Sequence, residues 1–164
     1  MKRLILVRHG KSSWKYDVPD DQRPLKKRAY KDAKVVLNTF KVFFKQNIDE
    51  VCLWTSYATR AKETAILFKE GLDISDKDFE IKEELYTFDK RALKTIIKNT
   101  PETIENLMIF SHNPGLTGLA NLLGDKNFGN IPTTGLVVVE FSQNQWQTIS
   151  EGKTLLTLFP KNIR

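Results

Sequence analysis

The fold is decided by Leu4-Ile5-Leu6-Val7-Arg8-His9-Gly10 and by Met108-Ile109-Phe110-Ser111-His112-Asn113-Pro114-Gly115. Each stretch begins with a short apolar run, typical of a buried strand, and continues directly into one of the two histidines of the chain. A side chain that follows a strand lies at the carboxyl edge of the sheet, where open α/β folds bind their ligands. We therefore expect the two histidines to share one site.

Size and composition indicate one ordinary globular domain. The chain has 164 residues, of which 40% are hydrophobic and 28% are charged, so we expect residues 1–164 to form a single domain. Cys52 is the single cysteine, which excludes an internal disulfide. Neither a signal peptide nor a membrane-spanning run is predicted, and we expect a cytoplasmic protein.

The net charge of +6 favours acidic partners through long-range attraction. Such a partner is a nucleic acid or a phosphorylated protein, and a solvated basic surface explains the same surplus. Lysines are scattered along the chain without the aromatic and basic pattern of an RNA-binding motif, so we expect no nucleic-acid partner.

Alternating strand and helix patterns predict a three-layer α/β/α sandwich around a mainly parallel sheet. After a loop at residues 11–24, apolar residues at spacings of three and four predict a long helix. Ser56 is predicted to cap the helix that runs to about Glu70. The predicted strands are residues 3–7, 51–55, 79–81 and 106–111, and further helices are predicted at 91–99 and 116–123. Near the end of the chain, a hairpin of residues 135–141 and 145–149 and an edge strand at 154–159 are predicted.

Arg8 and His9 form the first motif with a chemical meaning. A neutral imidazole is a competent nucleophile toward phosphorus, and an adjacent cation disfavours its protonation while binding phosphoryl oxygens. Gly10 would let the backbone approach a ligand closely. Taken alone, the triplet is weak evidence, because a histidine beside an arginine at a strand end is more often than not a surface pair.

Arg60 and His112 belong to two further motifs at strand ends. Arg60 falls in the first turns of a helix, near backbone N–H groups that favour an anion. Arg60 could also be a solvated helix residue, and His112 a histidine that merely ends a strand. Only the combination of the motifs points to a shared phosphate site.

The three motifs, in this order, resemble the histidine phosphatase superfamily, also called phosphoglycerate mutase-like. The resemblance is carried by Arg8-His9-Gly10, by Ser56 with Arg60, Ala61, Thr64 and Ala65, and by His112-Asn113-Pro114-Gly115. The short length is similar to that of the SixA-type phosphohistidine phosphatases. Several short segments also resemble that group: Lys11-Ser12, Trp14, Asp21 with Arg23-Pro24-Leu25, and Ile131-Pro132-Thr133.

The resemblance implies a phosphatase in which His9 attacks phosphorus and becomes phosphohistidine, which water then hydrolyses. Arg8, Arg60 and His112 would clamp the phosphoryl oxygens, with Ser12 as a further phosphate ligand. No metal and no cofactor is expected. The implied partner is a phosphohistidine-containing protein of the phosphorelay or phosphocarrier type, and we expect a monomer that acts away from membranes.

The chain departs from the superfamily pattern at three positions. Ser111 and Ala29 replace common glycines, and Thr87 stands where larger relatives carry a glutamate that protonates an alkoxide leaving group. Glu84 or Asp89 could replace that acid. A missing acid suits the imidazole of phosphohistidine better than an alkoxide, since the imidazole leaves with less proton transfer.

Two alternatives remain open from the sequence. One is a general small-molecule phosphomonoesterase of the same fold, and the other is a non-catalytic phosphate-binding module. A binder would need the arginines but not the nucleophile His9. A P-loop is excluded because Ile5 stands where its first glycine is required, and Cys52 lies too far before Arg60 for a cysteine phosphatase.

Overall fold

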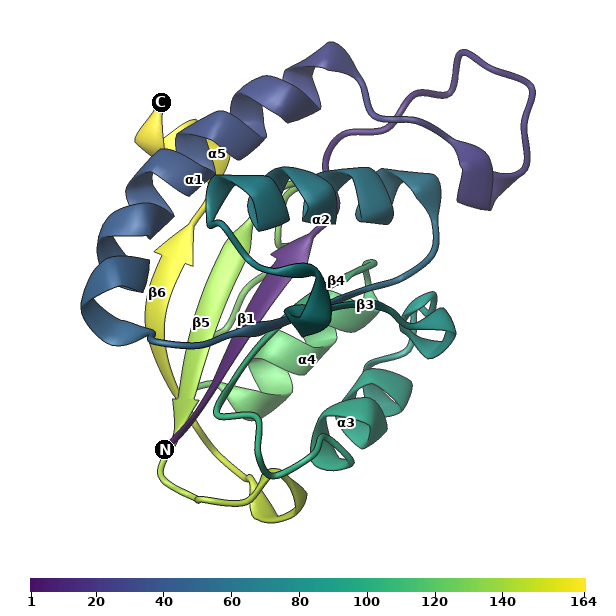
Figure 1. The fold of residues 1–164 in the computed structure, drawn as a ribbon. Helices are drawn as coiled ribbons and strands as arrows, with labels where there is room; N and C mark the ends of the chain where they lie inside the picture. The colour runs from purple at the N-terminus through teal and green to yellow at the C-terminus, as the bar shows by residue number, and fades with distance from the viewer.

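A computed structural model describes residues 1–164, and its six strands form one sheet in the order β3-β2-β4-β1-β5-β6 (Figure 1). The strands are β1 (Lys2–Arg8), β2 (Cys52–Thr55), β3 (Phe79–Ile81), β4 (Asn106–Ser111), β5 (Leu136–Phe141) and β6 (Lys153–Leu158). The pairs β1–β4, β2–β4 and β2–β3 are parallel, whereas β5 is antiparallel to both β1 and β6. The mainly parallel sheet is thereby confirmed.

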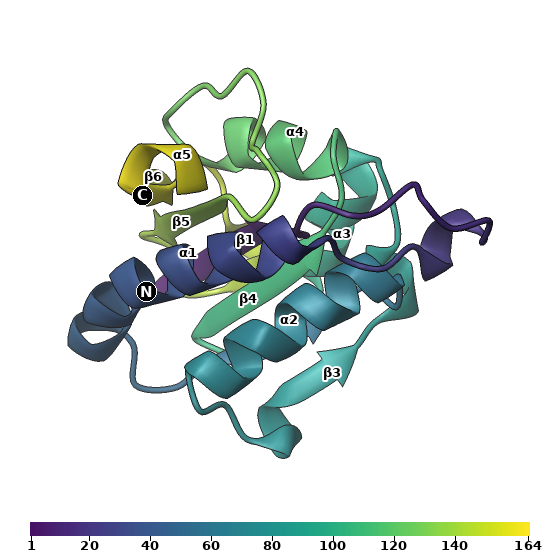
Figure 2. The same cartoon turned by 90° about the horizontal axis from the view of Figure 1, so that it is seen from above.

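Helices cover both faces of the sheet, as Figure 2 shows from above. The helices are α1 (Lys27–Asn47), α2 (Thr59–Gly71), α3 (Lys90–Lys98), α4 (Gly115–Leu123) and the short α5 (Pro160–Ile163). Alternate residues of each central strand enter opposite cores, because side chains along a strand alternate between faces. In β1, Leu4 and Leu6 pack with α3 and α4, while Ile5 and Val7 pack with α1 and α2. The predicted three-layer sandwich is confirmed.

The predicted hairpin partner of β5 is wrong. Residues 145–149 do not form a strand, because Trp146–Thr148 is a 3-10 turn and the Trp146 indole is buried, donating to the carbonyl of Ile104 (2.6 Å). The strand that pairs with β5 is β6, which corresponds to the predicted edge strand at 154–159 and does lie at the edge of the sheet.

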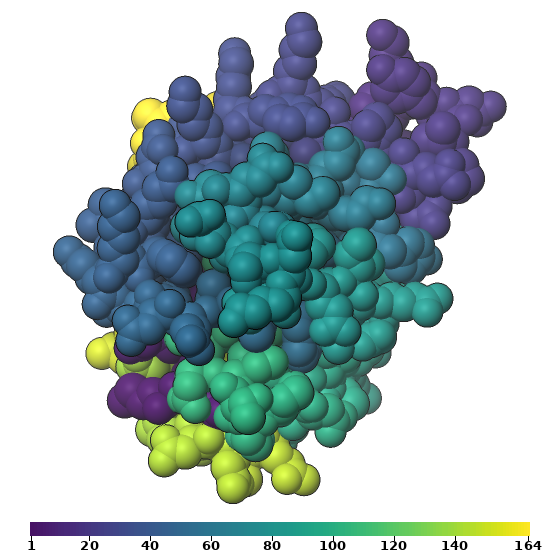
Figure 3. Space-filling model, viewed as in Figure 1, coloured from purple at the N-terminus to yellow at the C-terminus, as the bar shows by residue number.

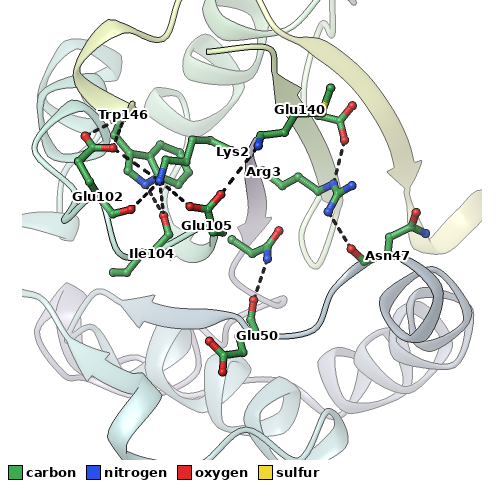
Figure 4. A network of polar contacts seen from close by, with 11 residues as sticks. Lys2, Arg3, Asn47, Glu50, Glu102, Ile104, Glu105, Glu140 and Trp146 are labelled. Carbon is green, nitrogen blue, oxygen red and sulfur yellow. Dashed lines mark hydrogen bonds and ion pairs between the residues drawn. The ribbon is translucent and has the colours of Figure 1, made fainter. Parts of the chain in front are cut away.

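A polar network closes the amino-terminal edge of the sheet, opposite the two histidines (Figure 4). The ammonium group of Lys2 is buried and donates to the carbonyls of Glu102 (2.7 Å) and Ile104 (3.1 Å) and to the Glu105 carboxylate (3.2 Å). Arg3 donates to Glu140 and to the carbonyl of Asn47. These contacts fix the start of β1 and therefore the position of the residues that follow its end.

None of the helices is both long enough and apolar enough to span a membrane.

Candidate active site

His9 and His112 lie together at the carboxyl edge of the sheet, as predicted. Their strands are hydrogen-bonded neighbours, with Arg8 of β1 opposite Ser111 of β4, so the next residue of each strand reaches the same place. The centroids of the two imidazole rings are 5.1 Å apart. Both rings line a cavity of about 260 Å³, together with Arg8, Ser12 and Arg60. The structure therefore brings together all five predicted site residues.

His9 is held as a neutral imidazole with one nitrogen free. Its Nδ1 lies 2.8 Å from the carbonyl oxygen of Gly10, which can only accept, so Nδ1 carries the proton and Nε2 keeps its lone pair. Burial lowers the pKa of His9 to about 3, and the charges of Arg60 and Arg8 act in the same direction. The imidazole is thus unprotonated at neutral pH, which is the state that a nucleophilic histidine requires.

Gly10 serves packing rather than ligand approach. A Cβ at this position would lie 2.8 Å from the Cβ of Ala29 in α1, and Gly10 is not among the cavity residues. Its N–H donates to the hydroxyl of Thr64 in α2 (2.9 Å). We expected the Gly10 backbone to approach a ligand closely, but in the structure it packs closely against α1 instead.

Arg60 enters the cavity from the first turn of α2 and is buried. The predicted Ser56 cap of this helix is wrong. The helix begins after Ala58 without a side-chain cap, and the Ser56 hydroxyl instead hydrogen-bonds Nε2 of His112 (2.8 Å). Burial lowers the pKa of His112 to about 3, with smaller effects of His9 and Arg60, so this ring is also neutral.

Three buried nitrogens at this site have no hydrogen-bond partner within the protein. They are Nε of Arg8, Nε of Arg60 and Nδ1 of His112. Buried donors are almost always paired in native proteins, and an unpaired one calls for a ligand or water. All three belong to residues that line one cavity, and with the cations of that lining they make it a candidate site for an anion.

Asp20 is the functional residue that the sequence did not reveal. Its main-chain carbonyl accepts from Nη1 of Arg60 (2.6 Å), and its carboxylate accepts from Nη2 of Arg60 (3.0 Å) and from the Tyr86 hydroxyl (2.6 Å). Burial alone would raise the pKa of Asp20, but hydrogen bonds from Tyr86 and Arg60 outweigh it and bring the pKa to about 2. Asp20 therefore accepts hydrogen bonds from both terminal nitrogens of the Arg60 guanidinium.

No other carboxylate lines the cavity. Glu84 and Asp89, the two candidate acids, are exposed and lie outside the cavity lining, and Asp89 instead caps α3 by accepting from the N–H of Arg91 (3.1 Å). Thr87 also lies outside the lining, while its neighbour Phe88 belongs to it. The cavity thus offers cations, neutral imidazoles and one ionised carboxylate, with no acid poised to donate a proton.

Ser12 lies in the cavity lining and its hydroxyl accepts from Nη1 of Arg23 (2.6 Å). Arg23 also donates to the Asp20 carboxylate (3.2 Å) and stacks on the Trp14 ring at 3.6 Å. Ser12 is therefore hydrogen-bonded to Arg23, a residue that the sequence singled out only through the family resemblance. Asp20 is the acidic residue that contacts Arg23.

Two further residues fix the backbone at the carboxyl edge of the sheet. Thr134 has a left-handed backbone (φ 62°), rare for a β-branched residue, and its N–H donates to the carbonyls of Arg8 (3.0 Å) and His9 (3.1 Å). The hydroxyl of Ser111, at a common glycine position, donates to the carbonyl of Leu85 (2.7 Å). It ties the end of β4 to the segment that carries Tyr86 and Phe88.

The candidate site combines two strand-end histidines with the guanidinium groups of Arg8 and Arg60. The sequence profile of the histidine phosphatase superfamily (branch 1) matches residues 4–86, about half of the chain, and the protein belongs to that superfamily. A search of curated proteins found no match.

Solved structures similar to this chain include SixA phosphohistidine phosphatases. The protein histidine phosphatase SixA complexed with tungstate is 19% identical, with 99% of each chain covered and a TM-score of 0.81. The proposed phosphohistidine phosphatase SixA from Agrobacterium tumefaciens is 18% identical, with 96% of this chain and 97% of that chain covered and a TM-score of 0.76. A mycobacterial glucosyl-3-phosphoglycerate phosphatase is 11% identical, with coverages of 95% and 98% and a TM-score of 0.66. These likenesses show the fold.

Proposed function

We propose that this protein removes the phosphoryl group from phosphohistidine in other proteins, through a covalent intermediate on His9. The observation that carries the proposal is the charge pattern of the cavity. A neutral His9 whose Nε2 carries the lone pair shares the cavity with Arg8, Arg60 and His112, each of which keeps one buried nitrogen without a partner in the protein, and no proton-donating acid lines the cavity.

In the first step, Nε2 of His9 attacks phosphorus while the bond from phosphorus to the substrate's imidazole nitrogen breaks. The substrate ring, protonated on its other nitrogen, takes the electron pair of that bond and leaves as a neutral imidazole. Arg8, Arg60 and Nδ1–H of His112 would stabilise the charge on the phosphoryl oxygens. Water then attacks phosphorus, the bond to His9 breaks, and inorganic phosphate is released. A module that only binds phosphate would have no use for the free Nε2 lone pair.

The intermediate can be tested by trapping. Labelled substrate should leave an acid-labile, alkali-stable phosphoryl group on the wild-type protein and none on His9→Ala. Label that persists on His9→Ala, or that is stable to acid, contradicts the assignment. Arg60→Ala and His112→Ala should each lower kcat by about 10²-fold or more while remaining folded.

The substrate class is tested by comparing a P–N with a P–O bond. General acid catalysis is typically worth roughly 10²–10⁴ in rate, and an alkoxide needs it far more than an imidazole does. We therefore expect a higher kcat/KM on a phosphohistidine protein than on phosphoserine peptides or sugar phosphates. Equal or better hydrolysis of an unactivated alkyl phosphate would favour the general phosphomonoesterase, the activity class named for the mycobacterial relative above.

We further propose that turnover needs no divalent metal, because cationic side chains are in place to bind the phosphoryl oxygens directly. Activity should survive dialysis against a chelator. Loss of activity that magnesium or zinc restores contradicts this part of the proposal.

A further inference from the structure

Residues 11–24, which we call the arm, project from the body of the molecule beside the active site (Figures 1, 2 and 3). The base of the arm is closed by backbone hydrogen bonds from Lys26 to Lys11 (2.8 Å) and from Ser13 to Pro24 (2.8 Å). Near its tip, Asp20 is bound to Arg60. The arm is thus fixed to the rest of the protein at its base and at Asp20, without help from a partner.

The arm carries large apolar side chains that the protein leaves exposed. Trp14 is 74% exposed, Tyr16 54% and Val18 38%, and every residue from Trp14 to Asp20 is exposed. Isolated exposed apolar residues are normal, but three within five positions of a projecting segment indicate a contact surface. Trp and Tyr are also the residues that contribute most binding energy in protein interfaces.

This surface is continuous with the catalytic cavity. Trp14 lines the cavity and stacks on Arg23, and Phe88 lines it as well. The cavity volume of about 260 Å³ is below the roughly 300–1,000 Å³ of typical small-molecule pockets, so it can hold a phosphorylated side chain but not the body of a protein. A protein substrate must therefore rest on the rim of the cavity, to which Trp14 of the arm belongs.

The charge of this region selects the kind of partner. Residues 11–28 contain six basic and three acidic side chains, and one of the three acids, Asp20, is already bound to Arg60. The surplus favours a partner with an acidic surface and speeds its encounter.

We propose that the exposed apolar side chains of the arm, Trp14, Tyr16 and Val18, form the docking surface for a folded phosphohistidine protein with an acidic surface. The inference rests on the proposed function and adds the place where the partner binds. The arm would raise the affinity for the protein body and leave the chemistry at His9 unchanged.

The test uses a double variant, Tyr16→Ser with Val18→Ser, because neither residue lines the cavity. Its control is Tyr30→Ser with Val42→Ser on α1, where the same residue types are 46% and 60% exposed. Two kinds of substrate are compared. Phosphoramidate offers a P–N bond without a protein body. The protein substrates are a phosphorelay domain and a phosphocarrier protein, each phosphorylated on histidine. Loss of two interface anchors should lower kcat/KM on the phosphoproteins about tenfold or more. Phosphoramidate hydrolysis should stay within about twofold, and the control should match wild type on both.

Equal loss on both substrates, or loss on neither, overturns the docking proposal. Binding is measured separately by calorimetry on His9→Ala, which cannot turn the phosphoproteins over. Arm-dependent binding of phosphoproteins that the wild type fails to hydrolyse would support docking and reject the proposed function. Hydrolysis of phosphoproteins without arm-dependent binding would support the proposed function and reject docking on the arm. A wild-type dimer in sedimentation that the arm variant converts to monomer would show that a second copy covers this face, which also overturns the proposal.

Discussion

At the scale of single residues, the site depends on which nitrogen of each imidazole carries the proton. The carbonyl of Gly10 settles this for His9, where Nδ1 donates and Nε2 is free. For His112, Nδ1 can donate to a phosphoryl oxygen only if Nε2 accepts from the Ser56 hydroxyl, 2.8 Å away. We therefore expect Ser56 to be a positioning residue that donates to Nε2 and so favours this tautomer of His112.

Ser56→Ala should lower kcat about tenfold with a smaller change in KM, because His112 loses the partner that keeps its proton on Nδ1 and its donor is needed most in the transition state. The measurement is steady-state kinetics on phosphoramidate, with ¹⁵N spectra of the two histidines as a second readout. The ¹⁵N shifts of His112 should move toward the other tautomer, which a merely structural role of Ser56 would not cause. Ser56→Cys, which retains a weak donor, should recover part of kcat. Unchanged nitrogen shifts in Ser56→Ala contradict the assignment.

At the scale of elements, the arm and α2 meet through Asp20 and Arg60, and this contact has two parts. The Asp20 carbonyl orients the guanidinium, while its carboxylate places a negative charge where a phosphoryl group is expected to bind. Substitution of the Asp20 side chain leaves its main-chain carbonyl in place, so the effect of the carboxylate charge can be measured apart from that of the carbonyl contact.

Asp20→Asn should tighten the binding of inorganic phosphate, because a negative charge that opposes the anion is removed. A unit charge at this range in a partly solvated site is worth on the order of 1 kcal/mol, which corresponds to roughly a fivefold to tenfold lower inhibition constant. The effect should shrink in high salt. Asp21→Asn is the matched control, since Asp21 makes no contact with Arg60. Weaker phosphate inhibition in Asp20→Asn would show instead that the carboxylate is needed to hold Arg60.

Apolar runs were sufficient to predict the parallel strands, since the three core strands at 3–7, 51–55 and 106–111 are buried on both faces. The pattern failed where a long-range contact overrides local preference. Ser56 is bound to His112, 56 positions away, rather than to its own helix, and Trp146 is buried against Ile104 rather than paired in a strand. Asp20 was missed for the same reason, because its partners Arg60 and Tyr86 lie 40 and 66 positions further along the chain.

At the scale of the whole molecule, folding keeps both histidines of the chain buried and neutral, although their ordinary pKa is 6.5. Above that pH the imidazoles are neutral in both the folded and the unfolded chain, so they do not make stability depend on pH. Below it, the unfolded chain binds protons that the folded protein does not bind until the pH approaches about 3. Stability must therefore fall as the pH drops through this window.

Each histidine should lower the free energy of unfolding by up to roughly 1.4 kcal/mol per pH unit in this window. The carboxylate of Asp20, whose pKa is lowered to about 2, adds to the loss at still lower pH, since it must be protonated on unfolding there. Urea denaturation from pH 8 to pH 4.5 measures the slope, and His112→Gln should reduce it by about one proton because one titrating group is removed. In the same range, ¹⁵N spectra of the folded protein should show neither imidazole titrating. A histidine that titrates near pH 6.5 in the folded state would contradict the burial argument, and with it the neutral nucleophile on which the proposed chemistry depends.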